Sequence, residues 1–312
     1  MLLAKNNSLQ ENLSRRFRRL LSQDPNGVPP WLPIVAEGDK PGLFLPSDAP
    51  WIVHADFGTL VGGIRALLMQ ALHPGSLTGV KNHSRYQQDP LGRLAGTIRW
   101  LTVTTFGSVD AVAGEAARVN RMHQRVTGEY QTGAGELKSY RAADEDLLLW
   151  VHIAFMESFL VAHQFYSAQP IPSGDAATGA DNYVGQWSRS VEPLGLTNVP
   201  MTEAELEKLI AEIYQSGQLS KTPDTESVIK FIQYPPLPAT AKPVYRLLFE
   251  AAVVSLRPEF RELLGLKAKS RWLIIPITRA VLKIMRWAIG PESPIEDAAR
   301  ARLIRARVWS PK

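Results

Sequence analysis

The chain of 312 residues contains no cysteine. Disulfides, Fe–S clusters, cysteine-bound structural zinc and thiolate-bound haem are therefore excluded, and histidine, carboxylate, tyrosine or methionine side chains remain as metal ligands. The absence of cysteine does not by itself fix the cellular compartment. With 45% apolar and 21% charged residues, the composition is that of a globular protein that can build a large core.

Several local patterns are also missing. The N-terminus, MLLAKNNSLQENLSRRFRRLLSQ, has no apolar stretch of the kind that a signal peptide needs, and Arg15, Arg16, Arg18 and Arg19 instead predict the basic face of a short amphipathic helix. No uninterrupted apolar run has membrane-spanning length, so we expect a cytoplasmic protein. HExxH, GxSxG and glycine-rich nucleotide loops are absent too, which leaves phosphate-binding functions without support.

Positive charge is concentrated near the C-terminus of a chain whose net charge is +5. The segment WLIIPITRAVLKIMRWA (Trp272–Ala288) carries Arg279, Lys283 and Arg286 at helical spacing. Three cations cost about 2.5–3.5 kcal/mol each in a membrane span, so this segment should not cross a bilayer. We expect it to pack on the domain with its basic side in water, and peripheral contact with an anionic membrane is the second interpretation. No nucleic-acid partner is expected, because the basic residues belong to no recognisable binding module.

Apolar residues recur every three or four positions in long blocks, whereas alternating strand-like runs are scarce. This periodicity predicts an all-α protein with a single helical bundle domain. The predicted helical blocks are Gly58–Leu72, Leu91–Thr105, Ser108–Thr127, Glu145–Tyr166, Glu203–Gln215, Val244–Leu256 and Trp272–Ile289.

Proline-rich stretches predict where the chain leaves these helices. We expect residues 1–50 to form an extended N-terminal segment with a short helix, residues 51–266 to form the helical domain, and residues 267–312 to form a basic C-terminal helix and tail that packs on it. Gln169–Asp181 and Gln233–Lys242 are predicted loops, and neither is long enough to require two domains.

His123 is the first candidate for chemistry. It lies in AARVNRMHQRVTG, where a helix would place it on the same face as Ala116, Val119 and Val126. Such a histidine is either a hydrogen-bonded core residue or a metal ligand that its apolar neighbours shield from water. The nearby arginines of this helix could reach an anionic group from its flank or could simply be solvated.

Other polar residues admit two interpretations as well. His152 has apolar neighbours in DEDLLLWVHIAFMESFLVAH, which suits a core hydrogen bond slightly better than a pocket wall. Arg93 and Thr97 are four residues apart and share one helix face, either as surface residues or as a charge and a hydroxyl presented to an anionic cofactor.

A histidine and carboxylate metal site is a separate hypothesis. His73, His83 and His152 could combine with Asp56 or Glu157 to bind a metal without haem. Spacing along the sequence does not decide whether these residues meet.

The order of five segments carries a resemblance to a known family. LMQALHP, NHSR, DPLGRLxxT, VxxxHxxVxG and DLLLWVH follow one another between Asp56 and Leu160. In this order they resemble the MpaB / latex-clearing-protein family of haem-dependent oxygenases, which contains the rubber oxygenase catalytic domain. Weaker similarity continues through PLGL and PEFRELLGL to Leu266.

This resemblance implies an all-α fold with a haem pocket in the core, haem b as the cofactor, and O₂ as a substrate. It implies that His123, in the VxxxHxxVxG segment, binds the iron on the proximal side. It also implies that Arg93 and Thr97 lie beside the haem, where Arg93 would bind a propionate and Thr97 would order water or polarise O₂.

Two departures from the family pattern limit the function that the resemblance implies. The rubber-cleaving enzyme has a lysine immediately before the matched threonine, whereas this chain has Gly96, and its catalytic glutamate has no match here. We therefore predict an oxygenase or oxidase that acts on a hydrophobic small molecule, terpenoid or lipid-like, and not on polyisoprene. The alternatives are the non-haem metalloenzyme described above and a non-catalytic protein that carries haem or lipid at a membrane surface.

Overall fold

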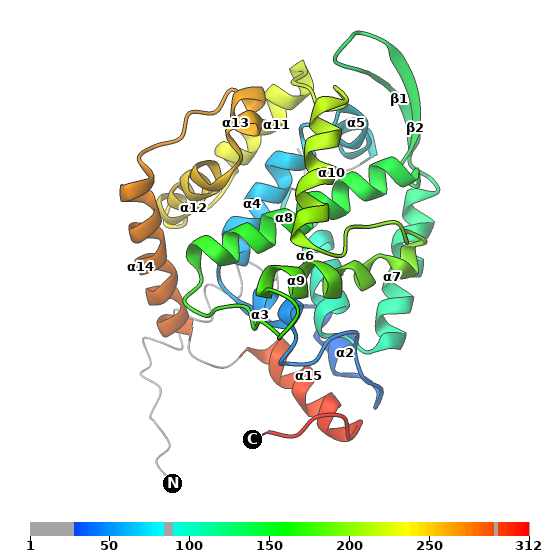
Figure 1. Ribbon diagram of the computed structural model, residues 1–312, viewed down its shortest axis with the longest axis vertical. Coiled ribbons are helices and arrows are strands. Elements are labelled where there is room, and N and C mark those ends of the chain that lie inside the picture. The colour runs from blue at the N-terminus through cyan, green and yellow to red at the C-terminus, as the bar shows by residue number, and fades with distance from the viewer. Residues whose placement is uncertain (1–27, 84–89, 290–292, 312) are drawn as a thin grey trace.

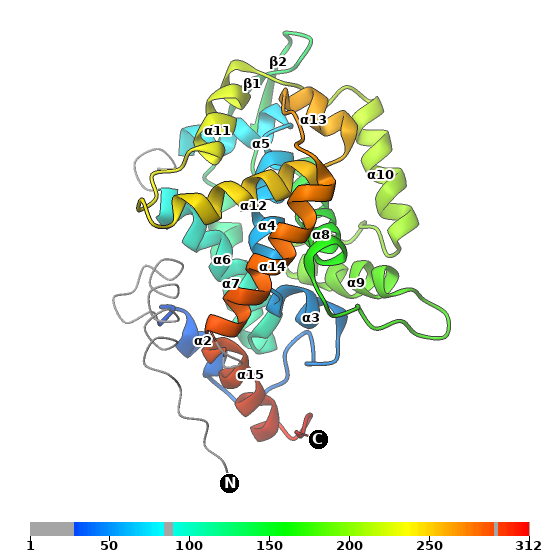
Figure 2. The same cartoon turned by 90° about the vertical axis from the view of Figure 1, so that its left-hand side faces the viewer.

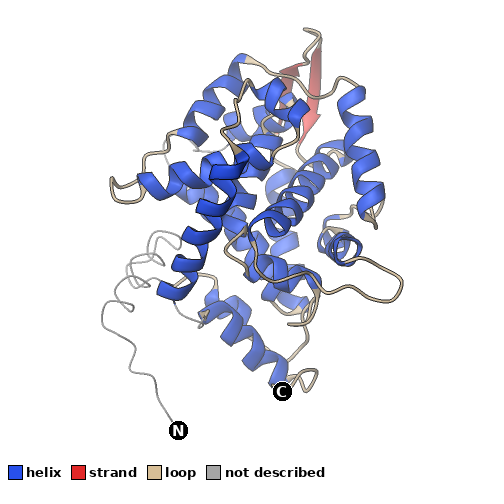
Figure 3. Cartoon of the chain, turned by 60° about the vertical axis from the view of Figure 1, so that its left-hand side comes forward, coloured by secondary structure: helices blue, strands red, loops and turns tan. Residues whose placement is uncertain are grey.

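The computed structural model describes residues 28–83, 90–289 and 293–311, and it does not describe the side chains of residues 83, 90–94 and 289. The arginines of the predicted N-terminal amphipathic helix lie outside the described residues. In the part of the chain that is described, fourteen α-helices form a bundle with one pair at its centre, and one small antiparallel hairpin projects from the bundle (Figures 1 and 3). The prediction of a mostly α-helical fold is confirmed.

The helices follow one another with short connections. They are α2 (Leu32–Ala36), α3 (Ala49–Ala55), α4 (Thr59–Gln70), α5 (Pro74–His83), α6 (Pro90–Phe106), α7 (Val109–His123), α8 (Glu145–Tyr166), α9 (Gly179–Trp187), α10 (Glu203–Gln215), α11 (Pro223–Gln233), α12 (Lys242–Ser255), α13 (Pro258–Leu264), α14 (Arg271–Ile289) and α15 (Pro294–Arg305). Two short 3₁₀ helices, η1 (Ser188–Ser190) and η2 (Glu192–Leu194), follow α9.

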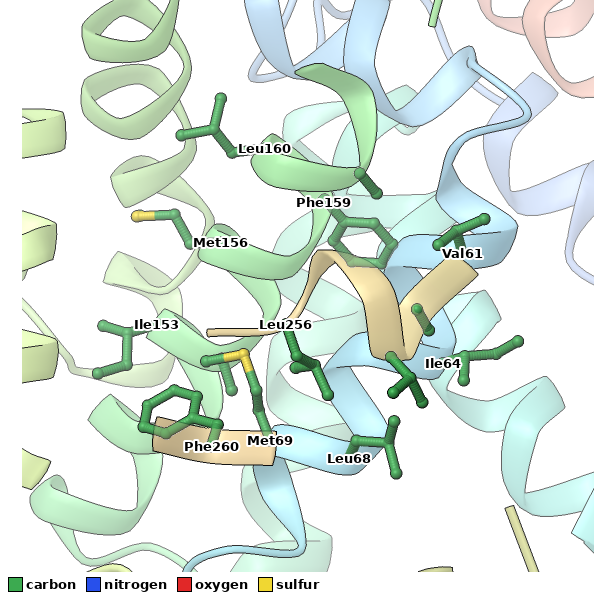
Figure 4. Close-up of a cluster of buried hydrophobic side chains, with 14 of the residues drawn as sticks. Val61, Ile64, Leu68, Met69, Ile153, Met156, Phe159, Leu160, Leu256 and Phe260 are labelled. Atoms are coloured by element: carbon green, nitrogen blue, oxygen red, sulfur yellow. The ribbon is translucent and has the colours of Figure 1, made fainter. Parts of the chain in front are cut away.

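Helices α4 and α8 form the centre of the bundle, and their close approach depends on a glycine. A Cβ atom at Gly62 would lie 2.6 Å from the ring of Phe159, so only glycine permits this approach. Burying one large apolar side chain contributes about 1.5–3 kcal/mol, and this interface buries several from each helix. Figure 4 shows Val61, Ile64, Leu68 and Met69 of α4 beside Ile153, Met156, Phe159 and Leu160 of α8, with Leu256 and Phe260.

The long central helix α8 has the bounds that its apolar periodicity predicts. Glu145 and Asp146 occupy its first turn, where the helix dipole favours negative charge. Among the described residues, α8 is the one helix long and apolar enough to span a membrane, and the bent pair of α3 and α4 passes the same test if it is counted as one span. Because 67% of the relevant α8 window is buried within the protein, α8 has the properties of a core helix.

The hairpin is the main departure from the predicted helices. The block expected to run to Thr127 ends at His123, and β1 (Thr127–Gln131) pairs with β2 (Leu137–Arg141) in antiparallel register, with Thr127 opposite Arg141. Gly135 adopts a φ of 86° in the turn, a conformation that glycine adopts readily. Helix α5 packs on β1 and holds the hairpin against the bundle.

Eight of the described helices begin at prolines or directly before them, which explains why the proline-rich stretches suggested breaks there. Proline at the first turn of a helix loses no hydrogen bond, because that N–H has no partner inside the helix. Helix α3 accordingly begins at Ala49, inside the N-terminal segment that we expected to be mostly extended, and α5 begins at Pro74, directly after the predicted helix that ends at Leu72. The other helices of this kind are α2, α6, α11, α12, α13 and α15.

Both ends of the described chain meet in a second apolar cluster. Helix α15 packs against α2 and α6 at the lower end of the molecule (Figures 1 and 2). The fully buried Arg302 donates hydrogen bonds to the carbonyl oxygens of Val35 (2.7 Å) and Phe106 (2.9 Å), which links the three helices. Helix α14 packs against α12 and α8 on the side that faces the viewer in Figure 2.

Candidate functional site: an apolar cavity beside α7

A cavity of about 260 Å³ lies where α5, α6, α7 and α8 meet β2 and the 3₁₀ helices. Its volume is near the lower end of the range for small-molecule sites, which is about 300–1,000 Å³. Met122, which lines the cavity, is 41% exposed, so the cavity reaches the protein surface at the end of α7. The cavity brings together His123, Thr97 and His152.

Helix α7 supplies the wall that contains His123. The hydroxyl of Ser108 accepts a hydrogen bond from the Ala111 N–H, which caps this helix at its first residues. At the other end His123 is the last helical residue, and Val119 and Met122 line the cavity one turn or less before it. His123 is therefore held at a helix end, in a largely apolar wall.

Helix α6 supplies the second wall, which includes Thr97, Gly96 and Trp100. Arg93 lies one helical turn before Thr97, and its side chain is outside the described residues. A Cβ atom added at Gly96 would have no heavy atom within 4 Å, so the structure has space for a side chain there. The lysine that the resemblance places at this position is thus absent from a site that has room for it.

His152 contributes to the cavity from α8. It lines the cavity together with Val151 and Phe155, although it is only 4% exposed. Burial lowers its pKa to about 3, so the imidazole is neutral near pH 7. Its Nε2 atom is buried and has no hydrogen-bond partner in the protein. The pocket-wall interpretation of His152 agrees with this position, and the core interpretation that the sequence slightly favoured does not explain the unpartnered atom.

Within the part of the chain that the structure describes, three further buried polar atoms on the cavity wall lack hydrogen-bond partners. They are the hydroxyl of Tyr140, the indole N–H of Trp187 and the hydroxyl of Ser190. Buried polar groups are nearly always hydrogen-bonded, so four such atoms around one cavity indicate water or a ligand with polar groups. Sequence periodicity gave no indication of these residues, because they come from the hairpin, from the last position of α9 and from the short segment after it.

The place of Tyr140 depends on two glycines. Gly128 stands directly opposite Tyr140 in the hairpin register, and a Cβ atom there would lie 3.1 Å from the tyrosine ring. A Cβ atom at Gly79 of α5 would lie 3.3 Å from the same ring. Without side chains at these two positions, the ring can lie across the strand and reach the cavity.

Arginines surround the mouth of the cavity. Arg118, Arg121 and Arg125 line a surface hollow together with Met122 and Val126, and Arg118, Met122 and Val126 also line the cavity itself. The hollow and the cavity therefore adjoin each other at these three residues. Three guanidinium groups at this point favour an anionic group at the edge of a bound ligand.

One buried carboxylate fixes part of this mouth. Glu115 accepts hydrogen bonds from Arg118 (2.6 Å) and Arg99 (2.9 Å). Burial by itself would raise the pKa of Glu115 and is the largest single influence, but the hydrogen bonds and charges of the two arginines together outweigh it and lower the pKa. The ionised Glu115 thus orients Arg118 beside the cavity, and positive charge remains in excess.

The predicted non-haem metal site is not assembled in the described part of the chain, where no group of three or more His, Cys, Asp or Glu side chains could hold a metal ion. Glu157 is paired with Arg65 at 2.6 Å, and Asp56 is paired with Arg286. His73 lies outside the cavity, where its Nδ1 accepts a long hydrogen bond of 3.4 Å from the Ser76 N–H. The side chain of His83 is outside the described residues.

Comparison with known proteins agrees with the order of motifs in the sequence. Residues 51–287 match the family described as the ER-bound oxygenase mpaB/B′ and rubber oxygenase catalytic domain. This match covers most of the chain, from α3 to the last turn of α14. No curated protein and no solved structure matches the chain.

Proposed function

This chain belongs to the family of mpaB and rubber oxygenase catalytic domains, and we propose that it is a haem-dependent oxygenase that uses O₂ to oxidise a hydrophobic small molecule. The family consists of oxygenase catalytic domains, which supports the reaction class. One observation carries the finer proposal: a single apolar cavity contains His123 in its wall and has three arginines at its mouth.

The residues of the cavity suit haem. In a protein without cysteine, an imidazole is the strongest available ligand for haem iron. The apolar wall suits the porphyrin, and the arginines at the mouth suit its propionates. When bound, haem would supply an iron centre at which O₂ is activated.

The chain's own residues would have distinct roles. His123 would hold the iron, while Arg93 and the arginines at the mouth would bind the propionates. Thr97 would donate a hydrogen bond within the cavity, and the apolar residues around it would exclude water and bind an apolar substrate. The unpartnered Nε2 of His152 and hydroxyls of Tyr140 and Ser190 would orient the polar groups of that substrate or of ordered water.

Polyisoprene is not the proposed substrate. Gly96 leaves the cavity without the lysine that the rubber-cleaving enzyme has at the matching position, and no glutamate is among the described residues that line the cavity. We therefore propose a small terpenoid or another lipid-like molecule as the substrate.

The test is the visible spectrum of the full chain purified with ample haem supply, with haem and iron quantified. We expect a haem absorption band that His123→Ala abolishes and that exogenous imidazole partly restores, because the cavity left by the side chain remains available. His152→Ala is the control inside the same cavity and should keep the band. Consumption of O₂ with candidate apolar substrates then separates an oxygenase from a non-catalytic carrier of haem or lipid.

Two results would overturn this proposal. The first is a folded protein that carries no haem under these conditions and does not bind added haem. The second is loss of haem from His152→Ala but not from His123→Ala, which would assign the iron to the other histidine of the cavity.

A further inference from the structure

The outer side of α14 exposes large apolar side chains. Trp272 is 89% exposed, Trp287 67%, Ile284 61%, Leu273 57% and Ile277 42%. We call these five residues the α14 face. Scattered exposed apolar residues are ordinary, but five on one helix form a continuous surface that needs an explanation.

The helix attaches to the protein by its opposite side. Ile274, Thr278 and Leu282 are its buried residues, they are spaced four apart, and they form the line along which α14 contacts α12 and α8. At 100° per residue, the α14 face lies on the part of the helix that points away from this line. Figure 2 shows α14 running along the outside of the bundle. The sequence predicted that the domain would cover the apolar side of this helix. In the structure the domain covers only part of that side.

Cations lie along one edge of the α14 face. Arg279 and Lys283 are exposed, and Arg279 is held by a hydrogen bond to the Phe165 carbonyl oxygen (2.6 Å). Arg286, expected to face solvent, is instead half-buried in its pair with Asp56. The exposed side of the helix is thus amphipathic in its own right, with apolar residues on one part and basic residues beside them.

We propose that the α14 face docks on an anionic lipid bilayer, with α14 lying in the plane of the interface. Apolar side chains would enter the boundary between headgroups and acyl chains, and Arg279 and Lys283 would contact anionic headgroups. Trp272 and Trp287 stand near the two ends of the helix, about 22 Å apart at 1.5 Å per residue. Tryptophan is enriched at the membrane–water interface, which suits both positions.

A second copy of this chain fits the surface less well. Arg279 and Lys283 lie near the middle of the helix, so an antiparallel two-fold pair of α14 helices would bring the cations of the two copies together. An anionic bilayer matches the same charges with opposite ones.

Docking in this way leaves the cavity accessible from another side. In Figure 1, α14 lies on the left of the molecule and α7, whose end forms the mouth of the cavity, lies on the right. Substitutions on α14 should therefore change membrane binding and leave ligand binding in the cavity unaltered.

The test is sedimentation of the full chain with phosphatidylcholine vesicles that either contain or lack phosphatidylserine. We expect binding to the anionic vesicles that weakens as salt is raised. The triple variant Trp272→Ser/Leu273→Ser/Trp287→Ser should bind at least about tenfold more weakly, because it removes three apolar side chains from the interface. A matched control, Leu137→Ser/Met201→Ser/Tyr234→Ser, removes side chains that are 65%, 51% and 60% exposed elsewhere and should bind like the unaltered chain.

A second pair of variants keeps the test decisive if the triple variant fails to fold. Lys283→Glu should weaken binding several-fold at low salt, and Lys208→Glu, an exposed lysine of α10, should not. Absence of binding by the unaltered chain would overturn the proposal, as would undiminished binding by the folded triple variant or by Lys283→Glu. A stable dimer that the α14 substitutions convert to monomer would overturn it in favour of a second copy as the occupant.

Discussion

Helices α7 and α14 are similar in outline, since each carries basic residues among apolar ones, two arginines in α7 and four arginines or lysines in α14, yet the fold uses them in opposite ways. The apolar side of α7 turns inward, with Val112, Ala116 and Val119 buried and its arginines at the mouth of a cavity. The apolar side of α14 turns mostly outward. The difference shows that the amphipathic pattern of a helix predicts the helix itself but not what its apolar side contacts, because that depends on which other elements cover it.

The largest expected effect comes from placing the same charge on each helix. Val119 is 8% exposed and lines the cavity, so Val119→Asp would bury an uncompensated carboxylate and should lower the free energy of unfolding by more than about 3 kcal/mol. Ile284 is 61% exposed, so Ile284→Asp should change the free energy of unfolding by no more than about 0.5 kcal/mol. Urea unfolding of the two variants checks this, and equal losses would contradict the contrast between the two helices.

The sequence predicted the helices of this protein better than it predicted the cavity. Helices α8 and α10 have the bounds that their apolar periodicity predicts, because α8 buries a long face and α10 buries Leu206 and Ile210, which are one helical turn apart. The hairpin was missed, because five-residue strands with one buried residue on β2 leave little alternation to detect. The cavity residues of the hairpin and of the segment after α9, Tyr140 and Ser190 among them, come together through tertiary packing alone.

The site residues illustrate the same limit. The order of the five sequence motifs singled out His123 and Thr97. The structure places both residues in the wall of one cavity. His152 was judged to be slightly more suited to the core because its neighbours on α8 are apolar. Those apolar neighbours include residues that line the cavity, so apolar surroundings in the sequence could not separate a core position from a pocket wall.

Acid should destabilise the protein through two buried histidines, His152 on the cavity wall and His54 of α3, which hydrogen-bonds with Thr105 and Tyr183. Burial lowers the pKa values of His152 and His54 from 6.5 to about 3 in the folded protein. Between these values the unfolded chain binds more protons than the folded protein does, so stability falls as the pH decreases from about 6.5 toward 3. Each histidine contributes at most about 1.4 kcal/mol per pH unit to this loss of stability.

The variant His152→Gln checks this slope, because it removes one of the two groups. Urea unfolding between pH 6.5 and 4.5 should give a smaller loss of stability per pH unit for the variant than for the unaltered chain. An unchanged slope would mean that His152 is not kept neutral by the cavity.

The arginines of α7 and the cations of α14 should act on different ligands. Arg118→Ala should weaken haem retention by about 1.5–3 kcal/mol, the net value of one hydrogen bond to a charged group. Lys283→Ala should leave haem retention unaltered and weaken only vesicle binding. Haem transfer to an acceptor protein measures the first effect. Equal haem loss from both variants would mean that overall charge, and not position at the mouth, retains the cofactor.

The smallest expected effect concerns a glycine of the cavity wall. Gly96 lies inside α6 with open space where a Cβ atom would be, so Gly96→Ala should stabilise the protein by about 0.5–1 kcal/mol through its helix propensity. Gly62→Ala is the contrasting variant, because its Cβ atom would meet Phe159 at 2.6 Å and should destabilise the protein. Thermal unfolding distinguishes the two, and a destabilising Gly96→Ala would show that the space beside α6 is filled.

If Gly96→Ala is stabilising, Gly96→Lys should also fold, and its amine, placed on the cavity wall, should shift the haem spectrum if it reaches the iron. That variant would show whether the missing lysine alone separates this cavity from that of the rubber-cleaving enzyme.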